Sequence, residues 1–327
     1  MFKDDEMQAL KRKVWIRIFL VILSILFVFF AIVNAAGLVI GDVFYKEFCV
    51  WNTRLDSKRF ATLQVTLEDG IKNKHWQNIS INSRLGYTLQ GTYLISPTPS
   101  NNTVVFVHGI NGSRLLGLWY APLYLQAGYN VLIYDSRASG ESGGNSVSWG
   151  FYEKYDLDQW IDWIEQRYPN GNIGVHGVSM GAATALMHAE MNEATHRVKF
   201  YVADSSYSDL EELLTQQIDA TVSLHDPLWV KLLLRYSSIM ANWQSGFHYE
   251  DVSPIQSVRN VTTPILYLHG DADVLVPAYM NEQLYAATKG YKEKYVFPGD
   301  AHAMAIFNHK VEYQRRISSF IATVFEK

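Results

Sequence analysis

From about residue 100 onward, short apolar runs alternate with segments long enough to be helices. Each run has four or five residues, a length typical of strands that are buried on both faces of a sheet. Between two runs, the segment 155–166 has the spacing of an amphipathic helix, with Leu157, Trp160 and Ile161 on one face. We expect strands at 103–107, 130–134, 172–175, 200–203, 264–268 and 294–297. This alternation predicts an α/β fold with a mostly parallel, twisted sheet flanked by helices.

The pattern before residue 100 is different. Runs at 79–82 and 86–95 have the composition of strands joined in a hairpin, so we place the start of the catalytic domain, 76–327, at Trp76. The segment 41–75 is mixed and charged, and its pattern fits either a juxtamembrane helix or a spacer.

The alternation breaks between Ala203 and Pro264, where about sixty residues separate two expected strands. This interval is too long for a simple crossover, and helical patterns at 209–220 and 227–243 occupy it. We therefore predict a small helical cap at about 206–260. Packing against the main sheet is an alternative for each of its candidate substrate-facing residues. These candidates are Leu213, Leu214, Ile218, Trp229, Leu232, Leu233 and Trp243.

The segment 18–40 is almost wholly apolar and long enough to cross a bilayer. Its 23 residues span the ~30 Å hydrocarbon core at about 1.5 Å per residue, whereas the apolar region of a signal peptide has only about 7 to 15 residues. Four of the cations in 1–17 lie directly before it, at positions 11–13 and 17, so we expect a cytoplasmic tail, an uncleaved signal anchor and an extracytoplasmic C-terminal domain. Cleavage after the sequence Val33-Asn34-Ala35 is the alternative.

Composition limits the binding partners and the cellular compartment that we expect for this chain. A net charge of −4 and a pI near 6.2 leave no basic surface for nucleic acid. The single cysteine, Cys49, excludes an intramolecular disulfide, and no lipobox precedes it. Four glycosylation sequons occur, but Asn111 lies in a loop that we expect beside the active site, where a glycan would obstruct it. We therefore expect a bacterial membrane protein rather than a eukaryotic secretory one.

The segment 176–181, His-Gly-Val-Ser-Met-Gly, carries the strongest chemical signal. It lies between an expected strand and a run of small helix-forming residues, so Ser179 falls on a sharp strand-to-helix turn. Gly177 and Gly181 flank the serine because such a turn leaves no room for a Cβ. A strained turn there would hold the Ser179 hydroxyl out of the sheet as a nucleophile.

A serine hydroxyl needs a base and an orienting acid, and both types of residue follow expected strands downstream. The strand at 264–268 is followed by His-Gly-Asp-Ala-Asp-Val-Leu-Val-Pro, which contains Asp271 and Asp273. The last strand is followed by Pro-Gly-Asp-Ala-His, which ends at His302. The order serine, aspartate, histidine differs from the orders used on the chymotrypsin and subtilisin folds.

From about Trp76 to the C-terminus, these motifs resemble the α/β-hydrolase superfamily. The chain is most similar to bacterial members with an N-terminal membrane anchor, often labelled serine-aminopeptidase-like or esterase-like hydrolases. The resemblance implies that Asp273 is the catalytic acid, with Asp204 as the alternative position, and that His302 is the base. It also implies an oxyanion hole. The backbone N–H of Met180 would be one donor, and that of Ile110, or alternatively Asn111, the other.

The sequence has no pattern for a cofactor or a metal. Its glycines do not form a dinucleotide fingerprint, and HExxH, Walker and His/Asp metal motifs are absent from the sequence. We therefore expect a metal-free serine hydrolase that cleaves a carboxylic ester or thioester through an acyl-enzyme. A peptidase acting on short peptides, a transacylase with the same triad, and an inactive membrane-tethered binding scaffold are the alternatives.

Overall fold

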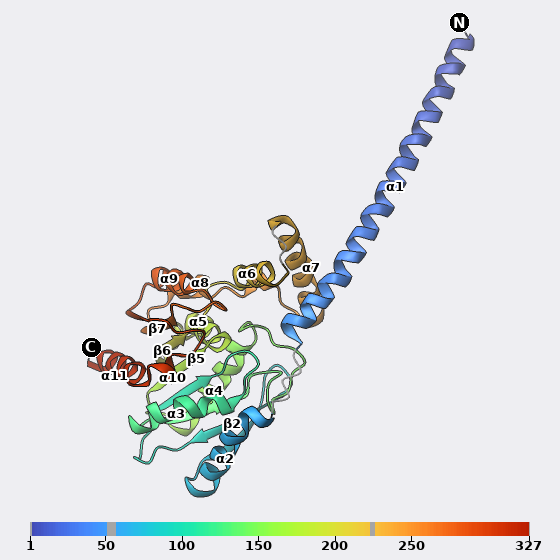
Figure 1. The fold of residues 1–327 in the computed structure, drawn as a ribbon. Coiled ribbons are helices and arrows are strands. Elements are labelled where there is room, and N and C mark those ends of the chain that lie inside the picture. The colour runs from blue at the N-terminus through green and yellow to red at the C-terminus, as the bar shows by residue number, and fades with distance from the viewer. Residues whose placement is uncertain (1, 51–56, 223–225, 327) are drawn as a thin grey trace.

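The computed structural model describes residues 2–50, 57–222 and 226–326 (Figure 1). The described residues form one eight-stranded sheet with the order β1-β2-β4-β3-β5-β6-β7-β8. The first three strands in this order pair antiparallel, and the remaining neighbours pair parallel. The strands are β1 (Gln77–Asn82), β2 (Thr88–Leu94), β3 (Thr103–Val107), β4 (Asn130–Tyr134), β5 (Ile173–Val178), β6 (Val198–Asp204), β7 (Ile265–Gly270) and β8 (Lys292–Phe297).

Helices cover both faces of this sheet, because alternate residues of the buried strands point to opposite sides. In β3, Val104 and Phe106 face the core under α2, α3 and α11, whereas Val105 and Val107 face the core under α4, α5 and α9. The helices are α1 (Phe2–Cys49), α2 (Ser57–Asn73), α3 (Gly117–Gln126), α4 (Glu153–Arg167), α5 (Met180–Asn192), α6 (Leu210–Val222), α7 (Pro227–Ser245), α8 (Pro254–Ser257), α9 (Ala278–Ala287), α10 (Ala305–Asn308) and α11 (Lys310–Glu326). The predicted α/β fold is confirmed.

The strand positions agree closely with those expected from the apolar runs. The runs at 103–107 and 130–134 coincide with β3 and β4, and the hairpin expected before residue 100 is the β1–β2 pair. The other strands are longer than their apolar runs, since pairing with a neighbour extends them. The extension matters in β5, which runs on to Val178 and so delivers Ser179 directly at its carboxyl end.

The segment 41–75 is helical on both sides of a gap. Its first part, up to Cys49, continues α1 without a break, and its second part contains α2. Residues 51–56 of this segment and residues 223–225 of the expected cap lie outside the described residues.

A third core joins the cap to the end of α1. The cap contains α6 and α7, and α7 lies beside the lower end of α1 (Figure 1). Tyr45 and Cys49 of α1 are buried in this core together with Leu213 of α6 and Leu234 of α7. The last turns of α1 are therefore part of the folded domain.

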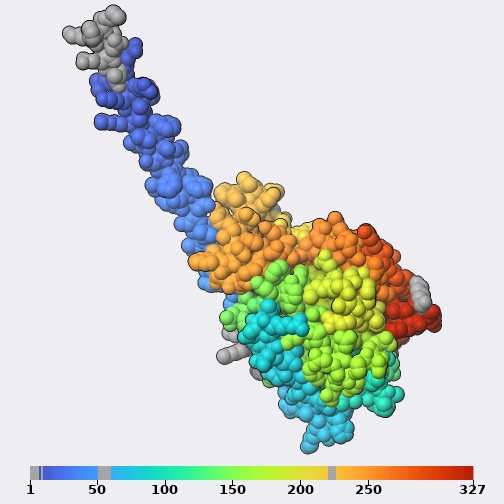
Figure 2. Space-filling view, turned by 180° about the vertical axis from the view of Figure 1, so that it is seen from behind, coloured from blue at the N-terminus to red at the C-terminus, as the bar shows by residue number. Residues whose placement is uncertain are grey.

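Helix α1 is a candidate membrane span. Among the described residues it is the one helix long and apolar enough to cross a bilayer, and no part of its most apolar stretch is buried. It projects well beyond the rest of the molecule (Figure 2). Its length and composition are compatible with a single-pass anchor, and a signal sequence near an N-terminus has the same character.

A buried polar network ties α11 to the sheet below the nucleophile turn. The Tyr313 hydroxyl donates to Asp204 Oδ2 at 2.7 Å and lies 3.1 Å from His176 Nε2. The Tyr124 hydroxyl lies 2.9 Å from the other ring nitrogen of His176. Burial lowers the pKa of His176 to about 3 and raises the pKa of Asp204. The network therefore holds a neutral imidazole between two tyrosines at neutral pH.

We expect Tyr313→Phe to lower the free energy of unfolding by about 1–3 kcal/mol, because it removes the hydroxyl that donates to Asp204 Oδ2 and contacts His176 Nε2 inside the buried network. The same Tyr-to-Phe change at Tyr155, which is exposed on α4, is the control and should stay within about 0.5 kcal/mol. Thermal or urea unfolding measures both. Equal effects for the two variants would contradict the structural role of the network.

Candidate active site

Ser179 occupies a strained turn between β5 and α5. Its backbone has φ 56° and ψ −121°, a region that a non-glycine residue enters only when the surrounding structure enforces it. Its N–H is held by the Asp204 carbonyl at 2.8 Å. The strain projects the side chain away from the sheet at the carboxyl end of β5, as the sequence pattern predicts.

The two glycines of the turn are required by close backbone approach. A Cβ on Gly177 would lie 2.1 Å from the carbonyl oxygen of Gly181, and a Cβ on Gly181 would lie 2.1 Å from the carbonyl oxygen of Val107 in β3. Both distances are far inside van der Waals contact. Only glycine at these positions allows α5 to begin this close to the sheet.

His302 and Asp273 reach Ser179 from two later loops. His302, in the loop after β8, places Nε2 at 2.9 Å from Ser179 Oγ. Its other ring nitrogen, Nδ1, lies 2.7 Å from Oδ2 of Asp273, which is in the loop after β7. With Nδ1–H donating to the carboxylate, Nε2 is free to accept the serine proton. The structure brings the three predicted residues into one hydrogen-bonded chain.

The environment of Asp273 keeps its side chain ionised. Burial by itself would raise the pKa of this carboxyl, but hydrogen bonds from His269 and His302 outweigh burial and lower it to about 2. The backbone N–H groups of Leu275 and Val276 also donate to Oδ1, at 2.9 and 2.8 Å. The carboxylate is therefore charged at neutral pH and fixed in orientation.

Asp204, the alternative position for the acid, has other partners. It accepts hydrogen bonds from the hydroxyls of Tyr313 and Ser205, at 2.7 and 2.9 Å. Geometry thus pairs Asp273, and not Asp204, with His302.

The loop after β3 passes directly beside the nucleophile. A Cβ on Gly109 would lie 3.1 Å from Ser179 Cβ, so the backbone that leads to Ile110 is in contact with the serine. His108 braces this loop, since its Nδ1 lies 2.7 Å from the Gly109 carbonyl and its Nε2 accepts from Ser136 N–H at 3.0 Å. The loop with Ile110, one of the two predicted oxyanion donors, therefore lies beside Ser179, and the other, Met180, is the next residue in the chain.

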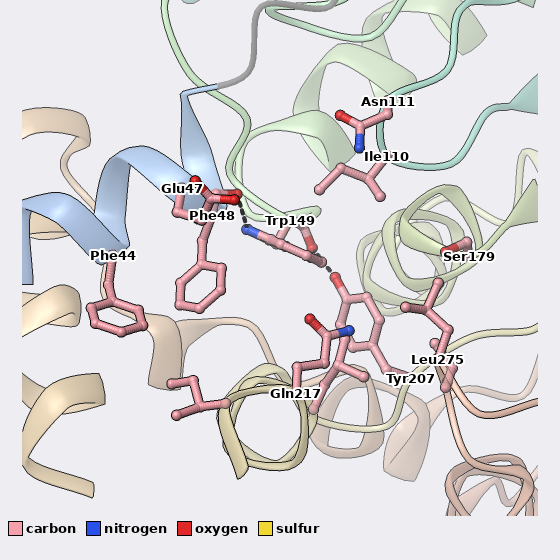
Figure 3. A pocket seen from close by; sticks show the side chains of 13 residues that line it. Phe44, Glu47, Phe48, Ile110, Asn111, Trp149, Ser179, Tyr207, Gln217 and Leu275 are labelled. Carbon is pink, nitrogen blue, oxygen red and sulfur yellow. Dashed lines mark hydrogen bonds between the residues drawn. The ribbon is translucent and has the colours of Figure 1, made fainter. Parts of the chain in front are cut away.

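Ser179 opens into a cavity of about 330 Å³ with mostly apolar walls (Figure 3). Three parts of the chain surround it: the end of α1, the cap helix α6, and the loops around the serine. The lining residues are Phe44, Glu47, Phe48, Ile110, Asn111, Trp149, Ser179, Tyr207, Leu213, Gln217, Ile218, Leu275 and Val276.

The predicted substrate-facing residues of the cap are only partly correct. Leu213 and Ile218 of α6 line the cavity, and Leu214 is buried in the core beneath them. The prediction was wrong for α7, because that helix turns toward α1 and not toward the serine. As a result, the candidates on α7 lie away from the cavity. Trp229, Leu232 and Trp243 are exposed, and Leu233 is half-buried.

Sequence reasoning missed the contribution of α1 to this cavity. Phe44 and Phe48 are one helical turn apart and face the cavity across from the cap (Figure 3). Their four-residue spacing is visible in the sequence. The sequence does not indicate, however, which surface an aromatic pair at this position will pack against. The contact depends on how α1 meets the cap.

Among the described residues, no group of three or more His, Cys, Asp or Glu side chains is arranged to hold a metal ion.

Comparison with known proteins agrees with this architecture. A family model described as the alpha/beta hydrolase fold matches residues 102–230. The protein YqkD of Bacillus subtilis is 34% identical over 242 residues, which cover 74% of this chain and 77% of that protein. The lysophosphatidylserine lipase ABHD12 of Mus musculus is 22% identical over 233 residues, covering 66% of this chain and 53% of that protein.

Among solved structures, the esterase Pf2001 of Pyrococcus furiosus superposes with a TM-score of 0.61 at 23% identity, covering 76% of this chain and 92% of that one. This similarity establishes the fold. Together with the family model and the YqkD match, it shows that the chain belongs to the α/β-hydrolase family, a membership that supports hydrolytic activity.

Proposed function

We propose that the protein is a serine hydrolase that cleaves an acyl ester through an acyl-enzyme. The observation that carries the proposal is the continuous hydrogen-bonded chain from Ser179 Oγ through His302 to Asp273, built on a strained turn. Fold alone would not support it, because the same scaffold carries other functions. An inactive scaffold has no need to maintain this geometry.

In the proposed first step, Ser179 Oγ attacks the carbonyl carbon of the substrate while its proton passes to His302 Nε2. Asp273 stabilises the resulting imidazolium through the Nδ1–H bond. His302 then gives the proton to the leaving oxygen or sulfur as the bond to it breaks, which leaves the acyl group on Ser179. Water repeats the sequence, with His302 as base and then acid, and the carboxylic acid is released.

The backbone N–H groups of Met180 and Ile110, with Asn111 as the alternative to Ile110, are the proposed oxyanion donors. The contact between Gly109 and Ser179 supports this assignment, because it brings the backbone of the β3 loop next to the serine, where oxyanion donors are needed. Removing one such donor typically costs about 10²–10³-fold in kcat. Since backbone groups make the bonds, substitution of side chains 110 and 180 tests them poorly.

An apolar acyl chain is the proposed occupant of the cavity. Its walls are largely apolar and aromatic, and they extend from Ser179 to Phe44 and Phe48. The similarity to a protein named lysophosphatidylserine lipase and to an esterase supports an ester over a peptide. We therefore propose a carboxylic ester or thioester with a chain of modest length.

The proposed location is the cell membrane. We propose that 18–40 forms a single-pass anchor, with the tail 1–17 in the cytoplasm and the hydrolase domain, 76–327, outside. The cations before the apolar run and the exposure of that run in the structure support this arrangement.

We expect Ser179→Ala to abolish both ester hydrolysis and labelling by a fluorophosphonate probe, since the probe reacts with an activated serine. Asp273→Asn should lower kcat by roughly 10⁴-fold, as for triad aspartates in general. Asp204→Asn is the matched control. It should lower the stability of the fold more than it lowers kcat, because Asp204 accepts a hydrogen bond from Tyr313. Persistent labelling of Ser179→Ala, or equal losses of kcat at the two aspartates, would refute the assignment.

We expect Phe48→Ala to shift the preferred acyl chain toward longer esters, because it removes a ring from the far end of the cavity. The ratio of kcat/KM for the octanoyl to the butyryl p-nitrophenyl ester should rise roughly tenfold. A change of this size corresponds to the discrimination that contacts with one or two methylene groups provide. Phe29→Ala, on the exposed face of the same helix, is the control and should leave the ratio unchanged. Aminoacyl anilides assayed in parallel test the peptidase alternative, and an unchanged ratio would exclude the proposed chain path.

We expect protease added to intact cells to digest the hydrolase domain while an N-terminal epitope tag remains protected. This follows from the cations before the apolar run, which stay on the cytoplasmic side. Detergent-permeabilised cells provide the control, in which both ends are cut. Full protection of the domain in intact cells would reverse the proposed orientation.

A further inference from the structure

Cap helix α7 and the anchor helix α1 lie side by side and run parallel. The Tyr236 hydroxyl donates to Asn34 Oδ1 at 3.0 Å, and Gln244 Nε2 donates to Asp42 Oδ1 at 2.6 Å. From the first contact to the second, the residue number increases by eight in α1 and by eight in α7. This is possible only if the two helices run in the same direction. Asn34, the polar interruption in the apolar run, is therefore an attachment point for the cap.

The helices are also in close backbone contact. A Cβ on Gly37 would lie 2.4 Å from the Tyr236 ring, and a Cβ on Gly41 would lie 2.6 Å from the Tyr236 backbone. Small residues four apart on a membrane helix create such close contacts. At the end of α1, Tyr45 and Ser245 hydroxyls meet at 2.6 Å. Because of these contacts α7 cannot move independently of α1.

This packing fixes the depth of α7 relative to the apolar run. Asn34 lies six residues before Ile40, the end of the run, which is about 9 Å at 1.5 Å per residue. Tyr236 is therefore level with a point inside the run. Because the helices are parallel, residues 227–235 extend from that level toward the middle of the run, into the depth of a bilayer that α1 would span.

The exposed side of α7 at this depth carries three large apolar residues. Leu228 is 62% exposed, Trp229 57% and Leu232 38%. Lys231 and Arg235 are also exposed on this stretch, and their long side chains can reach the headgroups. Tryptophan with flanking cations is typical of the membrane interface. In Figure 2 the end of α7 stands out from the domain beside α1.

We propose that residues 227–235 of α7 form a second membrane-binding element, whose Leu228, Trp229 and Leu232 insert into the same phospholipid bilayer that α1 spans. This inference rests on the proposed anchoring by α1. Two contacts of different kinds, one by a spanning helix and one by a helix end inserted from one side, then fix the domain against the membrane.

The position of the cavity gives this contact a function. Phe44 lies four residues past Ile40, about one helical turn beyond the apolar run, and it lines the cavity that contains Ser179. With residues 227–235 inserted in the bilayer, the wall formed by Phe44 and Phe48 lies at the lipid surface. The cavity then takes acyl chains from substrates held in the bilayer.

The test measures lipid contact at single labelled cysteines in the full-length protein, reconstituted in phosphatidylcholine vesicles with one-fifth phosphatidylglycerol. Native Cys49 is fully buried, so it is retained, and unsubstituted protein serves as the labelling blank. Leu228→Cys, and Leu232→Cys as a second variant should the first misfold, are labelled with an environment-sensitive fluorophore. Phe27→Cys in α1 and the exposed Val311→Cys in α11 are the controls. Lipids carrying a spin-label quencher report contact.

We expect strong quenching at positions 27 and 228 and none at 311. Quenching at 27 with position 228 as unquenched as 311 would overturn the α7 contact and leave the anchor standing. Absence of quenching at both 27 and 228 would overturn the anchor and the α7 contact together. If the fluorophore at position 228 has a blue-shifted emission but is not quenched by the lipid quencher, a second protein chain covers this face. That result also overturns the proposal.

Discussion

The site depends on one close backbone contact, in which the start of α5 lies against the carboxyl end of β3. Gly181 approaches the Val107 carbonyl so closely that no side chain fits between them. This contact enforces the positive φ of Ser179, and it aligns the serine with the loop after β3 that carries Ile110. A strained residue is stable here because the sheet on one side and the helix on the other leave it no alternative. The proposed nucleophile and the proposed oxyanion donors are therefore positioned by the same constraint.

Charge at the site is organised by hydrogen bonds that compete with burial. Asp273 is buried, which would favour its neutral form, yet two histidines and two backbone N–H groups keep it ionised. Asp204, only a strand away, is also buried, but its partners are hydroxyls, and its pKa is raised. Two aspartates at neighbouring strand ends thus differ in character because their partners differ. One is suited to orient an imidazole, and the other stabilises the network under the turn.

Helix α1 has a structural role beyond that of the proposed anchor. Its last turns are held by the catalytic domain, since Trp149 Nε1 donates to the Phe48 carbonyl at 3.1 Å and Val147 N–H donates to the Cys49 carbonyl at 2.9 Å. The same turns supply two aromatic walls to the cavity. The proposed anchor helix and the wall of the cavity therefore share residues. This arrangement is consistent with an enzyme whose substrate is presented by the surface to which it is bound.

The sequence by itself determined the α/β fold, the position of the strands, the serine turn and the order of its partners. These features depend on local patterns: apolar runs of strand length, glycines where a tight turn leaves no room for a Cβ, and serine, aspartate and histidine residues at the ends of strands. The choice between Asp273 and Asp204 needed distances, because both follow buried strands in the sequence. Only the tertiary structure showed that α7 packs against α1. As a result, Trp229 and Trp243 lie away from the cavity, and Phe44 and Phe48 line it. An apolar residue on a helix can pack against any apolar surface, and only the assembled chain selects which one.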